Sequence, residues 1–158
     1  MFPIVVALSC FIFLWGMVNY NSFVAKKRQI SLTFEALRVA QIQLGETIAQ
    51  LLAFGRSRSI SVPNALLTLP EWATIQPKAL MDDTCEAAST VLDSLLRSPE
   101  WKLNQELQRI ATALEEARTS YLAARKRYRA AVNGYNAEAN QMPSKIIARL
   151  FGFKSVNG

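Results

Sequence analysis

Residues 2–18 read FPIVVALSCFIFLWGMV and contain no charged side chain. Every Lys, Arg, Asp and Glu of the 158-residue chain lies at Lys26 or beyond. Because residues 19–25 are also uncharged, one helix running to Lys26 can cross a hydrocarbon core of about 30 Å at about 1.5 Å per residue. The stretch therefore predicts a transmembrane anchor at residues 1–25, followed by a helical domain at residues 26–158.

Three other interpretations of this segment fit less well. A cleaved secretory signal needs a basic n-region and a small-residue cleavage site, whereas here the apolar run ends in Asn19-Tyr20-Asn21-Ser22. A lipoprotein signal needs a small-residue box before its cysteine, but Ala7-Leu8-Ser9 precedes Cys10 and the run continues past it. A buried core helix is the third alternative, although a segment that is apolar on every face is uncommon in so short a soluble chain.

The charges beside the segment predict its orientation. Lys26, Lys27 and Arg28 follow the uncharged stretch directly, and nothing basic precedes it. The positive-inside rule then places the N-terminus outside and residues 26–158 in the cytoplasm. We expect a single-pass protein of the bacterial inner membrane, in which Cys85 is a reduced thiol.

The composition narrows the possible functions. The chain has a net charge of +6, two cysteines and no histidine. Without His there is no Ser-His-Asp or Cys-His nucleophilic system, and most zinc sites are excluded. We therefore expect no enzymatic activity, no cofactor and no metal ion. The basic charge predicts an anionic partner, and membrane lipid is favoured over nucleic acid.

A seven-residue repeat predicts that the first helix continues beyond the membrane. Its apolar positions are Phe23, Ile30, Leu37, Leu44 and Leu51, with Phe34 and Ile48 on the adjoining line. Gln41 interrupts that second line, and a polar residue at such a position can fix helix register or oligomer state. We expect the helix to run to about Phe54, because Gly55 is a natural C-terminal stop. The loop predicted after it covers residues 56–76.

Two further long helices complete the predicted bundle. The second runs from about Pro77 to Arg97. The third begins with Ser98 as its N-cap and Pro99 at the first helical position, and Pro143 ends it. Its seam consists of two parallel series: Leu107, Leu114, Tyr121, Tyr128, Tyr135 and Met142, and Leu103, Ile110, Ala117, Ala124 and Ala131. The predicted fold class is all-α, with a transmembrane helix that continues into an antiparallel bundle of three to four helices.

Arginine and lysine flank the tyrosines of this seam, which suggests an alternative function. Arg125, Lys126, Arg127 and Arg129 alternate with Tyr121, Tyr128 and Tyr135 and could hold a nucleic acid through stacking and phosphate contacts. The tyrosines continue a line begun by Leu107 and Leu114, so a core position is favoured for them. A nucleic-acid partner is therefore disfavoured.

A short amphipathic helix is predicted at residues 144–151. Ile146, Ile147, Leu150 and Phe151 share one side, with Phe153 just after them, and Lys145 and Arg149 lie on the other. The helix can lie on the membrane surface or close the end of the bundle, and the sequence does not separate the two. The candidate contacts with an anionic surface are Lys26, Lys27, Arg28, Lys145 and Arg149.

Several motifs, taken in order, resemble those of the LemA family. Tyr20-Asn21 directly follow the predicted span, and Tyr135-Asn136 lie late in the last long helix. Met142-Pro143-Ser144 then precede Phe151-Gly152-Phe153-Lys154. The stretch from Glu115 to Lys154 (EEARTSYLAARKRYRAAVNGYNAEANQMPSKIIARLFGFK) is similar to the family's C-terminal pattern along its whole length.

The first cytoplasmic helix is also similar to the family's pattern, with Phe34 where an aromatic residue is usual. The chain departs from the pattern at Ile48-Ala49-Gln50-Leu51-Leu52, where the family normally reads Ile-Pro-Asn-Leu-Val. We identify it as a divergent member. The residues that carry the resemblance are Tyr20, Asn21, Phe34, Tyr135, Asn136, Pro143, Phe151, Gly152 and Phe153.

The resemblance implies an antiparallel bundle of long helices, one N-terminal span, a short outside tail and a cytoplasmic body. It implies no established enzymatic activity. The expected function is a non-catalytic scaffold at the inner face of the membrane, formed by a homo-oligomer with lipid or protein partners. The alternatives are a basic helical module that binds anionic lipid headgroups or nucleic acid, and an accessory subunit of a membrane enzyme.

Overall fold

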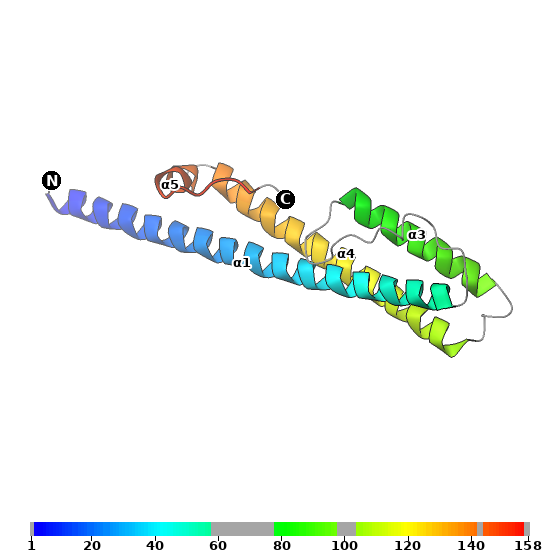
Figure 1. The fold of residues 1–158 in the computed structure, drawn as a ribbon. Helices are drawn as coiled ribbons and strands as arrows, with labels where there is room; N and C mark the ends of the chain where they lie inside the picture. Colours follow the sequence, from blue (N-terminus) through cyan, green and yellow to red (C-terminus); the bar gives the residue numbers. More distant parts are fainter. Residues whose placement is uncertain (1, 58–77, 98–103, 142–143, 157–158) are drawn as a thin grey trace. The chain divides into compact units, whose positions relative to one another are not determined.

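The computed structural model describes residues 2–57, 78–97, 104–141 and 144–156. With the labels of Figure 1, its helices are α1 (Phe2–Ser57), α3 (Lys78–Arg97), α4 (Gln105–Asn140) and α5 (Ser144–Leu150). These ranges contain no strand, so the predicted all-α class is confirmed. Apart from its first two residues, the predicted loop lies outside the described residues.

The helices divide into two compact units, to both of which α1 and α4 contribute. One unit consists of Met1–Glu35 and Arg125–Gly158, and we call it the tail unit. The other consists of Ala36–Ala124, and we call it the three-helix unit. The predicted division between anchor and body at residues 25 and 26 falls inside α1, which is unbroken there. That division stays a prediction.

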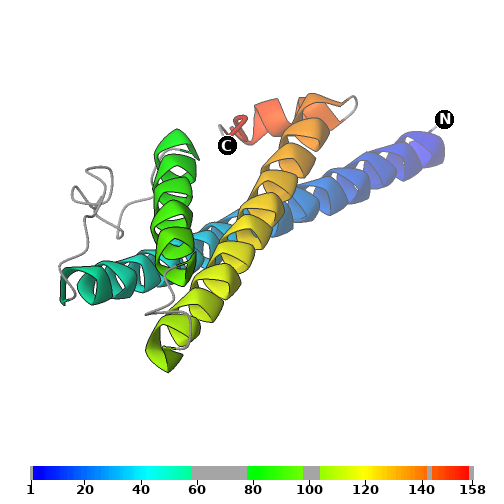
Figure 2. The same cartoon turned by 90° about the vertical axis from the view of Figure 1, so that its right-hand side faces the viewer.

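The three-helix unit buries the seams expected from the heptad pattern. Within it, α3 (green) lies against α1 and against the yellow part of α4 (Figure 2). The buried apolar side chains include Leu44, Ile48 and Leu51 from α1, Met81, Ala88, Val91, Leu92 and Leu95 from α3, and Leu107, Ile110 and Leu114 from α4. An apolar stripe on each helix faces a shared core, as expected for helix-on-helix packing.

Two predicted helix ends were wrong. α1 continues through Gly55 to Ser57, because a glycine inside a helix costs only about 1 kcal/mol and the neighbouring Phe54 is buried. α4 begins at Gln105, later than predicted, and the cap is Asn104. The Leu107 amide donates to Asn104 Oδ1 at 3.1 Å, the bond that an N-cap side chain makes to the third helical residue. Ser98 and Pro99 lie outside the described residues.

Gln41 lies at a fully buried position of α1, which makes its polar side chain a candidate for fixing helix register or oligomer state. We expect Gln41→Leu to be more stable to thermal unfolding but heterogeneous in mass by light scattering. Gln43→Leu changes an exposed glutamine on the same helix and should leave both properties unchanged. A Gln41→Leu protein with the same uniform mass as the parent protein would contradict a role of Gln41 in fixing the oligomer state.

Candidate functional site

The first part of α1 is apolar and exposed on all sides. No residue of its most apolar 18-residue window is buried. Ile4, Phe11 and Phe13 are each at least two-thirds exposed. This exposure argues against a buried core helix, and the helix is long and apolar enough to cross a membrane. α1 is therefore a candidate membrane-spanning helix.

Five aromatic residues gather where this exposed stretch ends. Phe23 is fully buried, with its ring stacked 5.0 Å from that of Phe153 and edge-on to Tyr135 at 6.0 Å. Tyr20 contacts Phe151 at 5.1 Å and Phe153 at 5.8 Å. We call these five residues the aromatic cluster. It joins the end of the candidate span to α4 and to the C-terminal segment, all within the tail unit.

The turn after α5 aims Phe153 into the aromatic cluster. Gly152 has φ +71°, and the Phe153 amide donates to the Ala148 carbonyl at 2.8 Å. The Gly152 amide donates to the Arg149 carbonyl at 3.4 Å. These are the two bonds of a Schellman motif, which ends a helix with a left-handed residue and brings the residue after it back against the last turn. Figure 1 shows the chain after α5 running beside the orange end of α4.

Alanine substitutions at Gly152 and Gly134 test how much the left-handed turn contributes to the stability of the tail unit. A Cβ at Gly152 or at Gly134 of α4 would meet no atom within 4 Å, so neither substitution causes a clash. We expect Gly152→Ala to destabilise the tail unit by about 1 kcal/mol, because its backbone is left-handed. Gly134→Ala should stabilise α4 by about 0.5–1 kcal/mol, since Ala is the better helix former. Hydrogen exchange of the two proteins would show the opposite signs, and equal signs would contradict the role given to the turn.

Two neighbouring residues of α4 hold the extended chain after this turn. The Asn136 side-chain amide donates to the Val156 carbonyl at 2.8 Å, and its oxygen accepts from the Val156 amide at 2.9 Å. The Tyr135 hydroxyl donates to the Lys154 carbonyl at 3.1 Å. Burial raises the pKa of Tyr135 above its usual value, so the hydroxyl keeps the proton that it donates. The side chains of Tyr135 and Asn136 therefore provide hydrogen-bond partners for backbone groups of the C-terminal segment that lie outside any helix.

Polar contacts between α1 and α4 also stabilise the tail unit. Ser22 Oγ donates to Glu138 Oε1 at 2.8 Å, and Lys26 forms an ion pair with Glu138 Oε2. Burial alone would raise the pKa of Glu138, but the hydrogen bonds from Lys26 and Ser22 and the lysine charge lower it overall. Lys26, predicted as a contact for an anionic surface, is thus already paired within the chain. Lys27, Arg28 and Arg149 are exposed, and Lys145 is half-buried.

The other predicted motif residues lie in different places. Phe34 packs against Tyr128 with 5.8 Å between ring centroids, and Asn21 is exposed on α1. Pro143 lies outside the described residues. Sequence reasoning missed the pairing of Ser22 with Glu138 and the central position of Phe23, which it placed only in the seam. The signal for Phe23 was its position one helical turn after Tyr20, on the same side of the helix.

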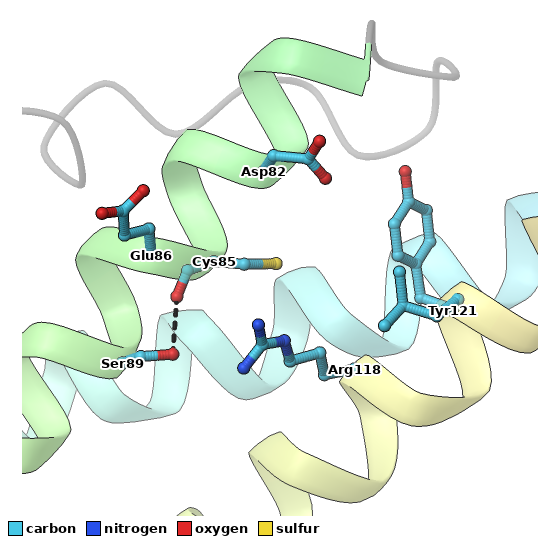
Figure 3. Close-up of a pocket in the computed structure, with 7 residues that line it drawn as sticks. Asp82, Cys85, Glu86, Ser89, Arg118 and Tyr121 are labelled. Carbon is cyan, nitrogen blue, oxygen red and sulfur yellow. Dashed lines mark hydrogen bonds between the residues drawn. The ribbon is translucent and has the colours of Figure 1, made fainter.

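The three-helix unit contains a pocket of about 330 Å³, shown in Figure 3. It is lined by Asp82, Cys85, Glu86, Ser89, Arg118, Tyr121 and Leu122. Burial raises the pKa of Cys85, and the opposing charge of Arg118 does not outweigh it, so the thiol stays protonated at neutral pH. Ser89 Oγ donates to the Cys85 carbonyl of its own helix at 2.8 Å. Neither the Cys85 thiol nor the Ser89 hydroxyl is therefore activated as a nucleophile in this arrangement.

The fold and the aromatic cluster define a class: an all-α protein whose candidate membrane-spanning helix meets a docked C-terminal segment. The LemA family profile matches residues 70–157, more than half of the chain, and the chain belongs to the LemA family. The match includes Tyr135, Asn136, Pro143 and Phe151-Gly152-Phe153, and it does not reach Tyr20, Asn21 or Phe34. Neither a curated protein nor a solved structure matches the chain.

Proposed function

We propose that the protein is a non-catalytic, single-span scaffold of the bacterial inner membrane, with its helical body on the cytoplasmic side. The observation that carries this is the unburied apolar stretch of α1, which Lys26, Lys27 and Arg28 follow directly. The positive-inside rule supports a cytoplasmic body for that arrangement. Anionic lipid at the inner face is the partner that the basic charge favours.

The chemistry of the tail unit supports a non-catalytic role. Three polar side chains of this unit form hydrogen bonds with distant parts of the same chain. Tyr135 and Asn136 bind the C-terminal segment, and Glu138 binds Ser22 of α1. The sequence contains no histidine to act as a general base. These three side chains therefore stabilise the tail unit, which favours a structural role for them.

Exposed apolar residues beyond the span support a homo-oligomer. Leu32 and Val39 of α1 and Leu122 of α4 each expose about half of their surface or more. They lie past Lys26, in the part that we assign to the cytoplasm, where contact with a second copy would remove them from water.

A second candidate function is a basic module for anionic partners, and the positions of two tyrosines favour lipid over nucleic acid. Lys126, Arg127 and Arg129 are exposed on α4. Tyr121 and Tyr135 are only 4% and 2% exposed, so neither ring is available to stack on a base. Salt-sensitive retention on a nucleic-acid column, without retention on anionic vesicles, would support nucleic acid instead.

Protease accessibility tests the proposed topology. With an epitope tag after Gly158, we expect the tag to survive protease in intact spheroplasts, to be cleaved only after detergent, and to stay in the carbonate-washed membrane pellet. A tag before Met1 is the matched control and should be cleaved in intact spheroplasts. Loss of the C-terminal tag from intact spheroplasts would overturn the orientation, and loss from the washed pellet would overturn the anchor.

A further inference from the structure

Two large apolar side chains of α5, those of Ile146 and Leu150, do not pack against the rest of the tail unit. Among the side chains of α5 that the structure describes, Ala148 is buried, whereas Ile146 is 50% and Leu150 73% exposed. At about 100° per residue, Ile146 and Leu150 lie roughly opposite Ala148 on the helix. A lid would bury its large apolar side chains and leave small ones outside. The described apolar side chains of α5 do the reverse, which favours an apolar environment on its outer side.

The outer side of α5 is continuous with the exposed apolar surface of the candidate span. Phe151 is more than half exposed and contacts Tyr20, which is itself partly exposed on α1. Met17, one turn before Tyr20 on the same side of the helix, is also exposed. The apolar surface of α1 therefore extends onto the C-terminal segment.

The length of helix needed to span the bilayer indicates how deep the contact between α1 and the C-terminal segment lies. A hydrocarbon core of about 30 Å needs about 20 helical residues. Every window of about that length within the uncharged stretch Phe2–Ala25 contains both Trp15 and Tyr20. Trp15 packs against the cluster of buried residues that includes Ala148, and Tyr20 contacts Phe151. The C-terminal segment thus contacts α1 at a level that the bilayer must reach.

The polar groups of the segment fit such a position. Lys145 and Arg149 lie on one flank of α5, between its buried and its exposed apolar side. The non-helical backbone at Lys154 and Val156 is hydrogen-bonded to Tyr135 and Asn136. Backbone outside a helix is tolerated near hydrocarbon only where such partners are provided.

We propose that α5 and Phe151 are inserted at the headgroup–acyl boundary of the inner leaflet, with Lys145 and Arg149 on anionic headgroups. The bilayer contact is then made by two elements, α1 and the C-terminal helix docked on it. This inference rests on the proposed membrane anchor and assigns to that anchor a second, interfacial part.

Site-directed fluorescence quenching in bilayers of phosphatidylethanolamine and phosphatidylglycerol tests the proposal on the full chain. Cys10 and Cys85 are replaced by Ala, and an environment-sensitive fluorophore is placed on one new cysteine at a time. The test position is Leu150→Cys. The references are Phe11→Cys in the span and Gln43→Cys, an exposed position of α1 about 27 Å along the helix beyond Ala25. The quenchers are aqueous iodide and a lipid with a nitroxide high on its acyl chain.

We expect the Leu150 label to be quenched by the nitroxide lipid and to be several-fold less sensitive to iodide than the Gln43 label. A Leu150 label that behaves like the Gln43 label, or that neither quencher reaches, overturns the interfacial position while the Phe11 label still reports the anchor. If iodide also reaches the Phe11 label, the anchor itself fails. Replacing Lys145 and Arg149 by Gln should raise iodide quenching at Leu150, but not in bilayers of phosphatidylcholine alone. An equal rise in both bilayers overturns the headgroup contact.

Discussion

Phe23→Ala is expected to release the C-terminal segment from the tail unit. The Phe23 ring is fully buried between Tyr135 and Phe153, so its removal leaves a cavity that these two rings cannot fill without moving. Phe→Ala substitutions at such positions cost about 3–5 kcal/mol. We expect the low end of that range, about 3 kcal/mol, because only a few elements surround the site.

Hydrogen exchange of two tail amides measures this loss directly. The amides of Phe153 and Val156 are both hydrogen-bonded in the docked segment. A loss of about 3 kcal/mol makes them exchange about 100-fold faster when exchange follows undocking. The matched control is Val24→Ala, which changes the next residue at an exposed position and should alter the same rates only slightly. Equal effects of the two substitutions would contradict the central position of Phe23.

The sequence predicts the long helices well because their information is local and repeated. Positions such as Leu37, Leu44 and Leu51 recur every seven residues, and all three are buried. An apolar side chain at a seam position is placed by its own helix, whichever helix packs against it. The uncharged start of α1 is equally local, since it depends on composition alone.

The helix ends and the C-terminal segment were harder to predict, because they depend on competition between alternatives. Both Ser98 and Asn104 are good N-cap residues, and choosing Asn104 requires knowing where α4 first packs. Glycine is typical of a helix C-terminus, yet α1 continues through Gly55 to Ser57 because its neighbour Phe54 is buried. Heptad positions cannot show which distant residues meet.

Family resemblance identified four of the five residues of the aromatic cluster, all except Phe23, but not that they meet. Tyr20, Tyr135 and Phe153 are far apart in the sequence and meet in one cluster only after the chain turns back at Gly152. That left-handed turn is a backbone property, which periodicity does not report. Apart from Asn21, Phe34 and Pro143, the motif residues are therefore best explained as the set that docks the C-terminal segment.

Asn136→Leu tests that explanation through polar groups alone. Leucine has a similar size but can neither donate to the Val156 carbonyl nor accept from its amide, so both groups lose their partner. Two lost bonds at a partly buried site cost about 2–3 kcal/mol. We expect the Val156 amide to exchange at least 10-fold faster. Asn140→Leu is the matched control, because Asn140 is exposed on the same helix and its side-chain amide donates to the Asn136 carbonyl of that helix.

Asn136→Asp separates the two halves of this contact. At neutral pH the carboxylate can still accept from the Val156 amide, but it faces the Val156 carbonyl without a proton to donate, so protection of the segment should fall. Below a pH of about 4 the side chain is protonated and can donate again, so protection of the Val156 amide, corrected for its intrinsic exchange rate, should recover. A loss at neutral pH with recovery in acid would identify Asn136 as the donor that docks the segment. Full protection at both pH values would show that the aromatic contacts suffice without it.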